Sequence, residues 1–237
     1  DDAAKANVIE PLALMLRNYN WEIKPVLTAL LKSEHFFDPL NQGCLIKSPV
    51  DFIIGLCREC EVPLPDSKDY TTWYSTLDGL LYQLELLQQS PGDPPSVSGW
   101  PAYYQIPSFH ELWINNDTYP RRTQFTDIMV YNGFTRLGFE LKMDTIAFAR
   151  SLSNPGDPKA LLDDSLATLY RIALSDAAKE QLKRDLLLTG QTNDYYWTNA
   201  WNTYIANPGN MMAYQTVHTR LNELYRYLLA LPEYQLS

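Results

Sequence analysis

Amphipathic helix patterns recur along almost the whole chain, and they constrain its fold more than any other feature. Residues 5–18, for example, carry apolar side chains at near-helical spacing, which is typical of a helix with one buried face. Strand signals are scarce. Only between Gly133 and Asp144 do apolar and charged residues alternate, which indicates one short strand. The sequence therefore predicts an all-α fold, an irregular multi-helix array of about nine or ten helices.

Helix-start signals place several of these helices. In Ser48-Pro49-Val50-Asp51, a serine can cap the helix, a proline suits its first position, and an acid lies at the positive end of the helix dipole. This helix is expected to end near Cys60, before Pro63 and Pro65. Further starts are predicted at Asn20, at Thr71 or Thr72, at Asp157-Pro158 and at Ser175. Later helices are expected over residues 145–151, 158–172, 176–189, 194–206 and 210–230.

A proline-rich segment over residues 90–107 interrupts the helices. Its five prolines and two glycines exclude a regular helix. A loop of this length inside a compact domain is usually functional or held by its own aromatic side chains. We therefore expect one long ordered loop within a single helical domain over residues 1–237.

The charge of the chain excludes some functions. The formal net charge is -9, and nucleic-acid binding and docking on anionic lipid both need a basic surface. No apolar run approaches the ~20 residues of a membrane span, so we expect no membrane insertion. The opening Asp1-Asp2-Ala3-Ala4 lacks the apolar core of a secretory signal peptide.

No residue pattern identifies a catalytic centre, a cofactor or a metal. The three histidines, His35, His110 and His218, are too far apart for ligand spacing on one helix. Cys57 and Cys60 form a C-x-x-C that could bind metal or carry redox chemistry, but without a second such motif they are better interpreted as small core residues. The chain has neither a G-x-S-x-G nucleophile motif nor a glycine-rich phosphate or dinucleotide loop.

Aromatic residues gather near residues 195–204. Trp197, Trp201 and Tyr204 share one helical face, which suits either a sugar-stacking platform or a core stripe against the last helix, and we favour the core stripe. Tyr195 and Tyr196 point elsewhere and are expected to be partly exposed.

The segment around the proline-rich loop holds the candidate ligand-binding residues. In the functional interpretation, Trp100, Trp113, Asn115 and Arg122, with His110 between the tryptophans, line a cleft for an anionic or sugar-like ligand. In the structural interpretation, Trp100 fills a core gap and Arg122 donates hydrogen bonds to loop carbonyls that lack partners. A loop that is held rigidly is compatible with both interpretations.

Several segments occur in a fixed order: residues 22–27, 30–33, 36–37, 46–52, 95–101 and 113–115, followed by Arg122 and Phe125. Together they resemble the C-terminal half of the bacterial domain-of-unknown-function 1800 family. Residues 1–135 carry these motifs, and residues 136–237 form a helical extension whose end is similar to Bacteroidetes-type members. The long aromatic stretch between Trp100 and Trp113 departs from the family pattern.

The resemblance implies an exported, extracytoplasmic protein of a family without an established activity. It also implies a C-terminal fragment of a larger protein. We therefore expect a non-catalytic binding or assembly module that engages a glycan, an exported sulfatase-like protein or its own N-terminal half. The alternative is part of a hydrolase for polysaccharides or their sulfate esters, with a site shared between the two halves.

Overall fold

The computed structural model describes residues 2–97, 99 and 110–237. The chain divides into two compact units, Asp1–Cys44 and Leu45–Ser237. The single domain over residues 1–237 stays a prediction. The all-α prediction is confirmed, because 63% of the described residues are helical, and these residues form ten separate helices and one two-stranded sheet. No helix in the described part has the length and apolarity needed to cross a membrane.

The first unit is a helical hairpin followed by an irregular segment. Its first helix is continuous through α1 (Asp2–Ala4), a π-helical turn and α2 (Glu10–Asn18), and its second is α3 (Ile23–Leu31). The predicted cap at Asn20 is wrong. Asn20 instead adopts a left-handed conformation with φ of 51° in the turn between the helices, a conformation that asparagine tolerates better than most residues. No described residue of this unit is buried, so the buried face expected for residues 5–18 is wrong.

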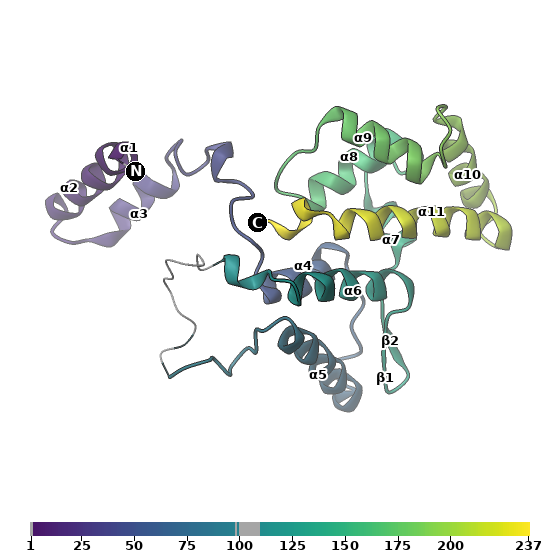
Figure 1. Cartoon of the computed structure of the whole chain (residues 1–237), viewed down its shortest axis with the longest axis horizontal. Coiled ribbons are helices and arrows are strands. Elements are labelled where there is room, and N and C mark those ends of the chain that lie inside the picture. The colour runs from purple at the N-terminus through teal and green to yellow at the C-terminus, as the bar shows by residue number, and fades with distance from the viewer. Residues whose placement is uncertain (1, 98, 100–109) are drawn as a thin grey trace. The chain divides into compact units, whose positions relative to one another are not determined.

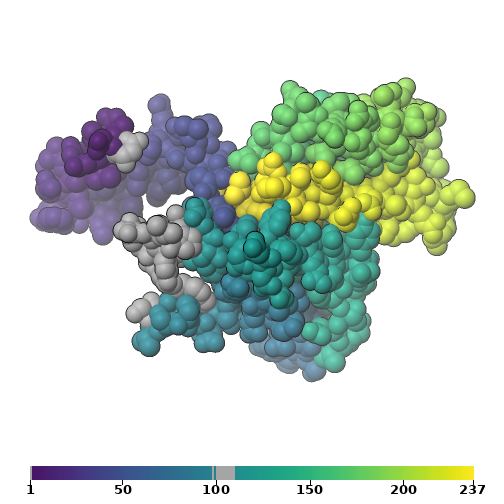
Figure 2. Space-filling model, viewed as in Figure 1, coloured from purple at the N-terminus to yellow at the C-terminus, as the bar shows by residue number. Residues whose placement is uncertain are grey.

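The second unit contains the remaining helices and the sheet. Its helices are α4 (Pro49–Glu59), α5 (Tyr70–Leu86), α6 (Thr118–Tyr131), α7 (Thr145–Ser151), α8 (Pro158–Leu169), α9 (Asp176–Leu182), α10 (Tyr195–Ala206) and α11 (Met211–Ala230). Short helical turns are η3 (Glu111–Trp113), η4 (Lys183–Leu187) and η5 (Pro232–Gln235). Within this unit, α11 runs between α8 and α9 on one side and α6 on the other (Figure 1). The same arrangement is visible in the space-filling view, where α11 is yellow (Figure 2).

Several helices begin at residues whose side chains cap the first turn. Ser48 Oγ accepts from Asp51 N at 3.2 Å and donates to the Asp51 carboxylate at 2.8 Å, which confirms the predicted start of α4. The predicted caps Asp157 and Ser175 are also confirmed. The start of α5 lies slightly earlier than predicted, because Asp69 rather than Thr71 or Thr72 accepts the N-terminal hydrogen bond.

The ambiguous segment 133–144 is a β-hairpin. Strands β1 (Phe134–Arg136) and β2 (Phe139–Leu141) pair antiparallel, with Phe134 opposite Leu141. Leu137 and Gly138 both have positive φ, 47° and 82°, as a two-residue hairpin turn of the favoured hand requires. The short strand expected here is therefore confirmed, and it has a partner strand.

The core of the second unit gathers around α11. Its buried face includes Val217, Leu221, Leu224, Tyr225 and Leu228, all fully buried. Burying this stripe removes a large apolar surface from water and is the main source of the unit's stability.

The aromatic stripe of α10 belongs to the same core. Trp197, Trp201 and Tyr204 are buried, and Trp197 Nε1 donates to Pro155 O at 2.8 Å. The core interpretation of this stripe is thus confirmed, and the three rings are not available as a sugar-stacking platform.

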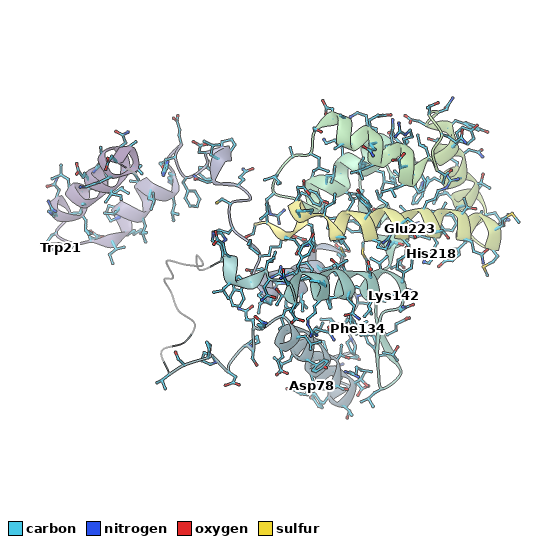
Figure 3. The ribbon with its side chains drawn as sticks, in the orientation of Figure 1. Trp21, Asp78, Phe134, Lys142, His218 and Glu223 are labelled. Carbon is cyan, nitrogen blue, oxygen red and sulfur yellow. The ribbon has the colours of Figure 1, made fainter. Side chains whose placement is uncertain are left out.

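A polar network covers the edge of the α6–α11 contact. Figure 3 labels Glu223 and His218 on α11 and Lys142, which follows β2. Glu223 accepts a hydrogen bond from the Tyr131 hydroxyl, and Lys142 Nζ donates to Tyr131 O at 2.6 Å. These bonds tie the end of α6 to α11 and to the hairpin.

Of the proline-rich segment, residues 90–97 and 99 contain neither helix nor strand, which agrees with the prediction for that part. Trp100 and the rest of the expected ordered loop lie outside the described residues.

Candidate functional site

The residues before α4 pair with the residues after α11. Lys47 N donates to Gln235 O at 2.7 Å and Ser237 N donates to Leu45 O at 2.8 Å, with an isolated antiparallel bridge between Ile46 and Leu236. This short pairing lies over the N-terminal half of α6, and we call it, with Arg122, the Arg122 junction.

Arg122 on α6 is fully buried and donates to three segments of the chain. Its Nη2 donates to Lys47 O at 2.8 Å and, with a longer bond of 3.5 Å, to Trp113 O. Its Nη1 donates to Gln235 Oε1 at 3.3 Å, and its Cζ lies 4.8 Å from the centre of the Phe52 ring. These acceptors lie outside the proline-rich segment 90–107, so donation from Arg122 to carbonyls of that loop stays a prediction.

The junction buries two cationic side chains, Arg122 and Lys47. Among the described residues Arg122 has no ion pair, and its Nε has no hydrogen-bond partner. Burial lowers the pKa of Arg122 to about 10, so the guanidinium is still cationic at neutral pH. Lys47 Nζ lies 3.9 Å above the Tyr234 ring. Burial also lowers the pKa of Lys47, although the nearby Glu59 carboxylate favours its charged form.

Trp113 and Asn115 build the turn that leads into α6. Trp113 is 3% exposed, and its carbonyl accepts from Thr118 Oγ1 at 3.0 Å. Asn115 Oδ1 accepts from the backbone N–H groups of Asp117 and Thr118 at 2.8 and 2.9 Å, which satisfies donors at the start of the helix. Both residues are thus engaged in local structure.

The structure brings together four of the five predicted ligand-binding residues. His110 Nδ1 accepts from Ile46 N at 3.5 Å, beside the pairing that Arg122 supports, while Trp113 and Asn115 lead into its helix. Trp100 lies outside the described residues. Ligand binding at these positions stays a prediction, and the contacts that are visible serve the fold.

The C-x-x-C cysteines are embedded in the core. Cys60 is 4% exposed and Cys57 is half-buried. Burial raises the pKa of Cys57 to about 11 and that of Cys60 further, so both are protonated thiols at neutral pH. Such thiols are poor nucleophiles and poor metal ligands. Within residues 2–97, 99 and 110–237, no group of three or more His, Cys, Asp or Glu side chains is arranged to hold a metal ion.

A surface groove of about 420 Å³ lies between α10 and the beginning of α11. We call it the Tyr195 groove. It is lined by Tyr195, Tyr196, Asn199, Ala200, Thr203, Asn210, Met212, Ala213, Thr216 and Arg220. Tyr195 and Tyr196 are 63% and 47% exposed, as expected from the sequence, and their rings meet edge to face with centroids 6.4 Å apart.

The groove rests on a rigid base. Trp197 and Trp201, on the buried side of the same helix, fix α10 to the core. Arg220 Nη1 donates to Tyr196 O at 3.0 Å and to Leu187 O at 3.1 Å, which ties the start of α10 to α11. Exposed aromatic rings on a fixed helix, flanked by amide and hydroxyl groups, can stack on the apolar face of a sugar ring and bond its hydroxyls.

Sequence reasoning did not identify this groove as a site. The pair Tyr195-Tyr196 off the core stripe was the available signal. The residues from α11 that complete the groove could not be assigned without the fold.

Comparison with known proteins gives one match. The family model described as protein of unknown function (DUF1800) matches residues 1–236, which confirms the family resemblance and extends it over nearly the whole chain. No curated protein and no solved structure matches the chain.

Proposed function

We propose that this chain, which belongs to the DUF1800 family of proteins of unknown function, is a non-catalytic binding module that holds a glycan in the Tyr195 groove. We also propose, from the family resemblance, that it is the C-terminal part of a larger, exported bacterial protein of Bacteroidetes type.

The exposure of Tyr195 and Tyr196 above a fixed helix is the observation that carries the proposal. Adjacent exposed aromatic rings form a contiguous apolar patch, and such a patch rimmed by polar groups is typical of a binding surface. Here they lie beside Asn199, Thr203 and other polar side chains in one groove. A sugar, which has an apolar ring face and a hydroxyl edge, complements this mixture better than a purely apolar ligand does.

A binding titration with two variants tests the proposal. Calorimetry or NMR with a panel of neutral and acidic oligosaccharides is expected to detect binding to the intact chain. Replacing both Tyr195 and Tyr196 by alanine should weaken it about tenfold or more, since each ring contributes roughly 1 kcal/mol of stacking. Tyr74→Ala is the matched control, because Tyr74 is 66% exposed on α5 and does not line the groove.

Three results decide between the functions. Loss of binding in the double variant but not in the control supports the glycan-binding module. Absence of binding to the whole panel refutes it. Turnover of a polysaccharide or its sulfate ester would favour the alternative, in which the chain forms part of a hydrolase.

The first unit favours a second role, assembly with another polypeptide. Ile23, Leu27 and Leu31 form one stripe of α3, and they are 62%, 47% and 46% exposed. A two-helix hairpin without a buried residue has little stability of its own. We propose that the stripe docks on protein, either the protein's own N-terminal half or an exported sulfatase-like protein.

A co-purification experiment with each candidate protein tests this role. Leu27→Lys should abolish the complex, because it places a charge in the middle of the stripe. Lys24→Glu, an exposed change on the same helix, is the control. A complex that survives Leu27→Lys would show that the stripe is not the contact.

A further inference from the structure

We propose that the Tyr195 groove selects acidic sugars, those that carry a carboxylate or a sulfate, over neutral ones. The inference rests on the proposed glycan binding and adds the chemical class of the ligand. Three features of the groove carry it: occupied acceptors, an oriented guanidinium and the absence of acidic side chains from its lining.

The amide oxygens of the groove are already used by the protein. Asn199 Oδ1 accepts from Tyr195 Oη at 3.3 Å. Asn210 Oδ1 accepts from the backbone N–H groups of Met212 and Ala213 at 3.0 and 3.2 Å. In the described structure neither Nδ2 group donates a hydrogen bond, so both asparagines offer donors to a ligand. Donors in excess of acceptors suit a ligand rich in oxygen acceptors.

Arg220 is held so that part of its guanidinium is left for a ligand. Its Nη1 is fixed by the carbonyls of Leu187 and Tyr196. No bond from its Nε or Nη2 is formed within the described part of the chain. Burial lowers the pKa of Arg220, but a guanidinium stays cationic at neutral pH. A positioned planar cation with unused N–H groups recognises oxyanions such as carboxylate and sulfate.

The lining of the groove contains no carboxylate, although the chain has a net charge of -9. The acidic residue at the start of α10, Asp194, forms an ion pair with Lys183 Nζ at 3.0 Å. Within the groove, an anionic ligand would therefore meet the Arg220 cation and no negatively charged side chain. The hydroxyls of Thr203 and Thr216 donate to backbone carbonyls at 2.7 and 2.9 Å, which leaves their oxygens as acceptors for sugar hydroxyls.

Pairs of oligosaccharides that differ only in charge can show whether the groove recognises the charge or the shape of a sugar. We suggest calorimetry with a galacturonic acid trisaccharide and its neutral methyl ester, and with a sulfated galactan oligosaccharide and its desulfated form. The acidic member of at least one pair should bind about tenfold or more tightly than its neutral partner. The preference should shrink with added salt. Comparison of the two pairs distinguishes carboxylate from sulfate as the recognised group.

Two variants locate the preference in the groove. Arg220→Gln should remove it, whereas Arg121→Gln, an equal charge change on α6, should not. Because Arg220 also supports two carbonyls, its loss can disturb the fold. Asn199→Asp is therefore a second variant, since it places a carboxylate on an exposed position of the groove without changing side-chain size. It should suppress acidic ligands and spare neutral ones.

The outcomes are distinguishable. Equal affinity for the acidic and neutral members of both pairs overturns the inference and leaves glycan binding intact. A preference that persists in folded Arg220→Gln and in Asn199→Asp also overturns it, because the selectivity then lies elsewhere. Binding of no member of either pair removes the proposed glycan binding together with the inference.

Discussion

Replacing Arg122 by alanine is expected to destabilise the second unit by about 3 kcal/mol. The bond from Nη2 to Lys47 O, 2.8 Å long, is charge-assisted and contributes roughly 1.5–3 kcal/mol. The bonds of 3.3 and 3.5 Å are near the geometric limit and add little. The contact with the Phe52 ring contributes about 1–2 kcal/mol in this desolvated setting.

One opposing effect lowers the total for Arg122. Its guanidinium is buried without an ion pair, and its Nε has no partner in the described structure. Removing the charge relieves that desolvation cost. Arg122→Met, which keeps most of the volume and removes the charge, should therefore cost less than Arg122→Ala, about 1–2 kcal/mol.

Urea unfolding followed by tryptophan fluorescence and a thermal melt measure these changes. A loss of 3 kcal/mol corresponds to a fall in Tm of roughly 6–12 °C for a unit of this size. Arg121→Ala is the control, because that side chain is exposed and pairs only with Asp117, and it should change stability by less than about 0.5 kcal/mol. If Arg122→Ala lies within about 1 kcal/mol of the wild type, the junction does not hold the fold. Arg122 would then be a candidate ligand-binding residue again.

Three further predictions follow from single contacts. Trp197→Ala should lower the free energy of unfolding in urea by about 4 kcal/mol, because the ring is fully buried. An equal loss of stability for Tyr195→Ala, whose ring is exposed, would contradict the division of α10 into a core face and a groove face. Gly133→Ala should cost about 2–3 kcal/mol of unfolding free energy, since φ is +68° and a Cβ would lie 2.8 Å from Glu140 Cγ and 2.9 Å from Lys142 Cβ. Gly55→Ala in α4, where a Cβ would meet no atom within 4 Å, should be neutral or stabilising. A larger loss of stability for Gly55→Ala than for Gly133→Ala would refute this reasoning. Burial and Lys142 lower the pKa of His218, against a weaker opposing effect of Asp144, so the unfolded state binds more protons between the folded pKa and the ordinary value near 6.5. Stability should therefore fall as the pH is lowered through that window, and His218→Gln should reduce the fall; an imidazole NMR titration with a pKa above the ordinary value would exclude this.

Local chemistry explains which parts of the fold could be predicted. The side chains of Ser48, Asp157 and Ser175 each cap the helix that begins at the next residue. The start signal of each of these helices therefore lies within a few neighbouring residues. Where several candidates are adjacent, the choice depends on small differences in backbone angle. The turn at Asn20 and the start of α5 at Asp69 are both of this kind.

The candidate sites needed information that no local pattern contains. Arg122 was expected to donate to carbonyls of the proline-rich loop, but the observed acceptors Lys47 and Gln235 are 75 and 113 residues away along the chain. The Tyr195 groove likewise depends on Arg220, 24 residues after Tyr196. Sequence periodicity correctly placed Trp197 and Trp201 on a buried face of α10, but the buried face that it indicated for residues 5–18 is wrong. It also could not show which faces of different helices meet.

The pairing of residues 45–47 with residues 235–237 determines how the second unit responds to a pulling force. The two segments run antiparallel, and Leu45 and Ser237 bond at the same end of the pairing. A force applied at these two positions loads the hydrogen bonds one after another, as in opening a zipper, rather than all at once. The Leu45–Ser237 contacts would break first, then the Lys47–Gln235 bond, and the Arg122 bonds behind it would be exposed to water. Single-molecule pulling through these ends should therefore open the junction at low force before the helices around α11 unfold.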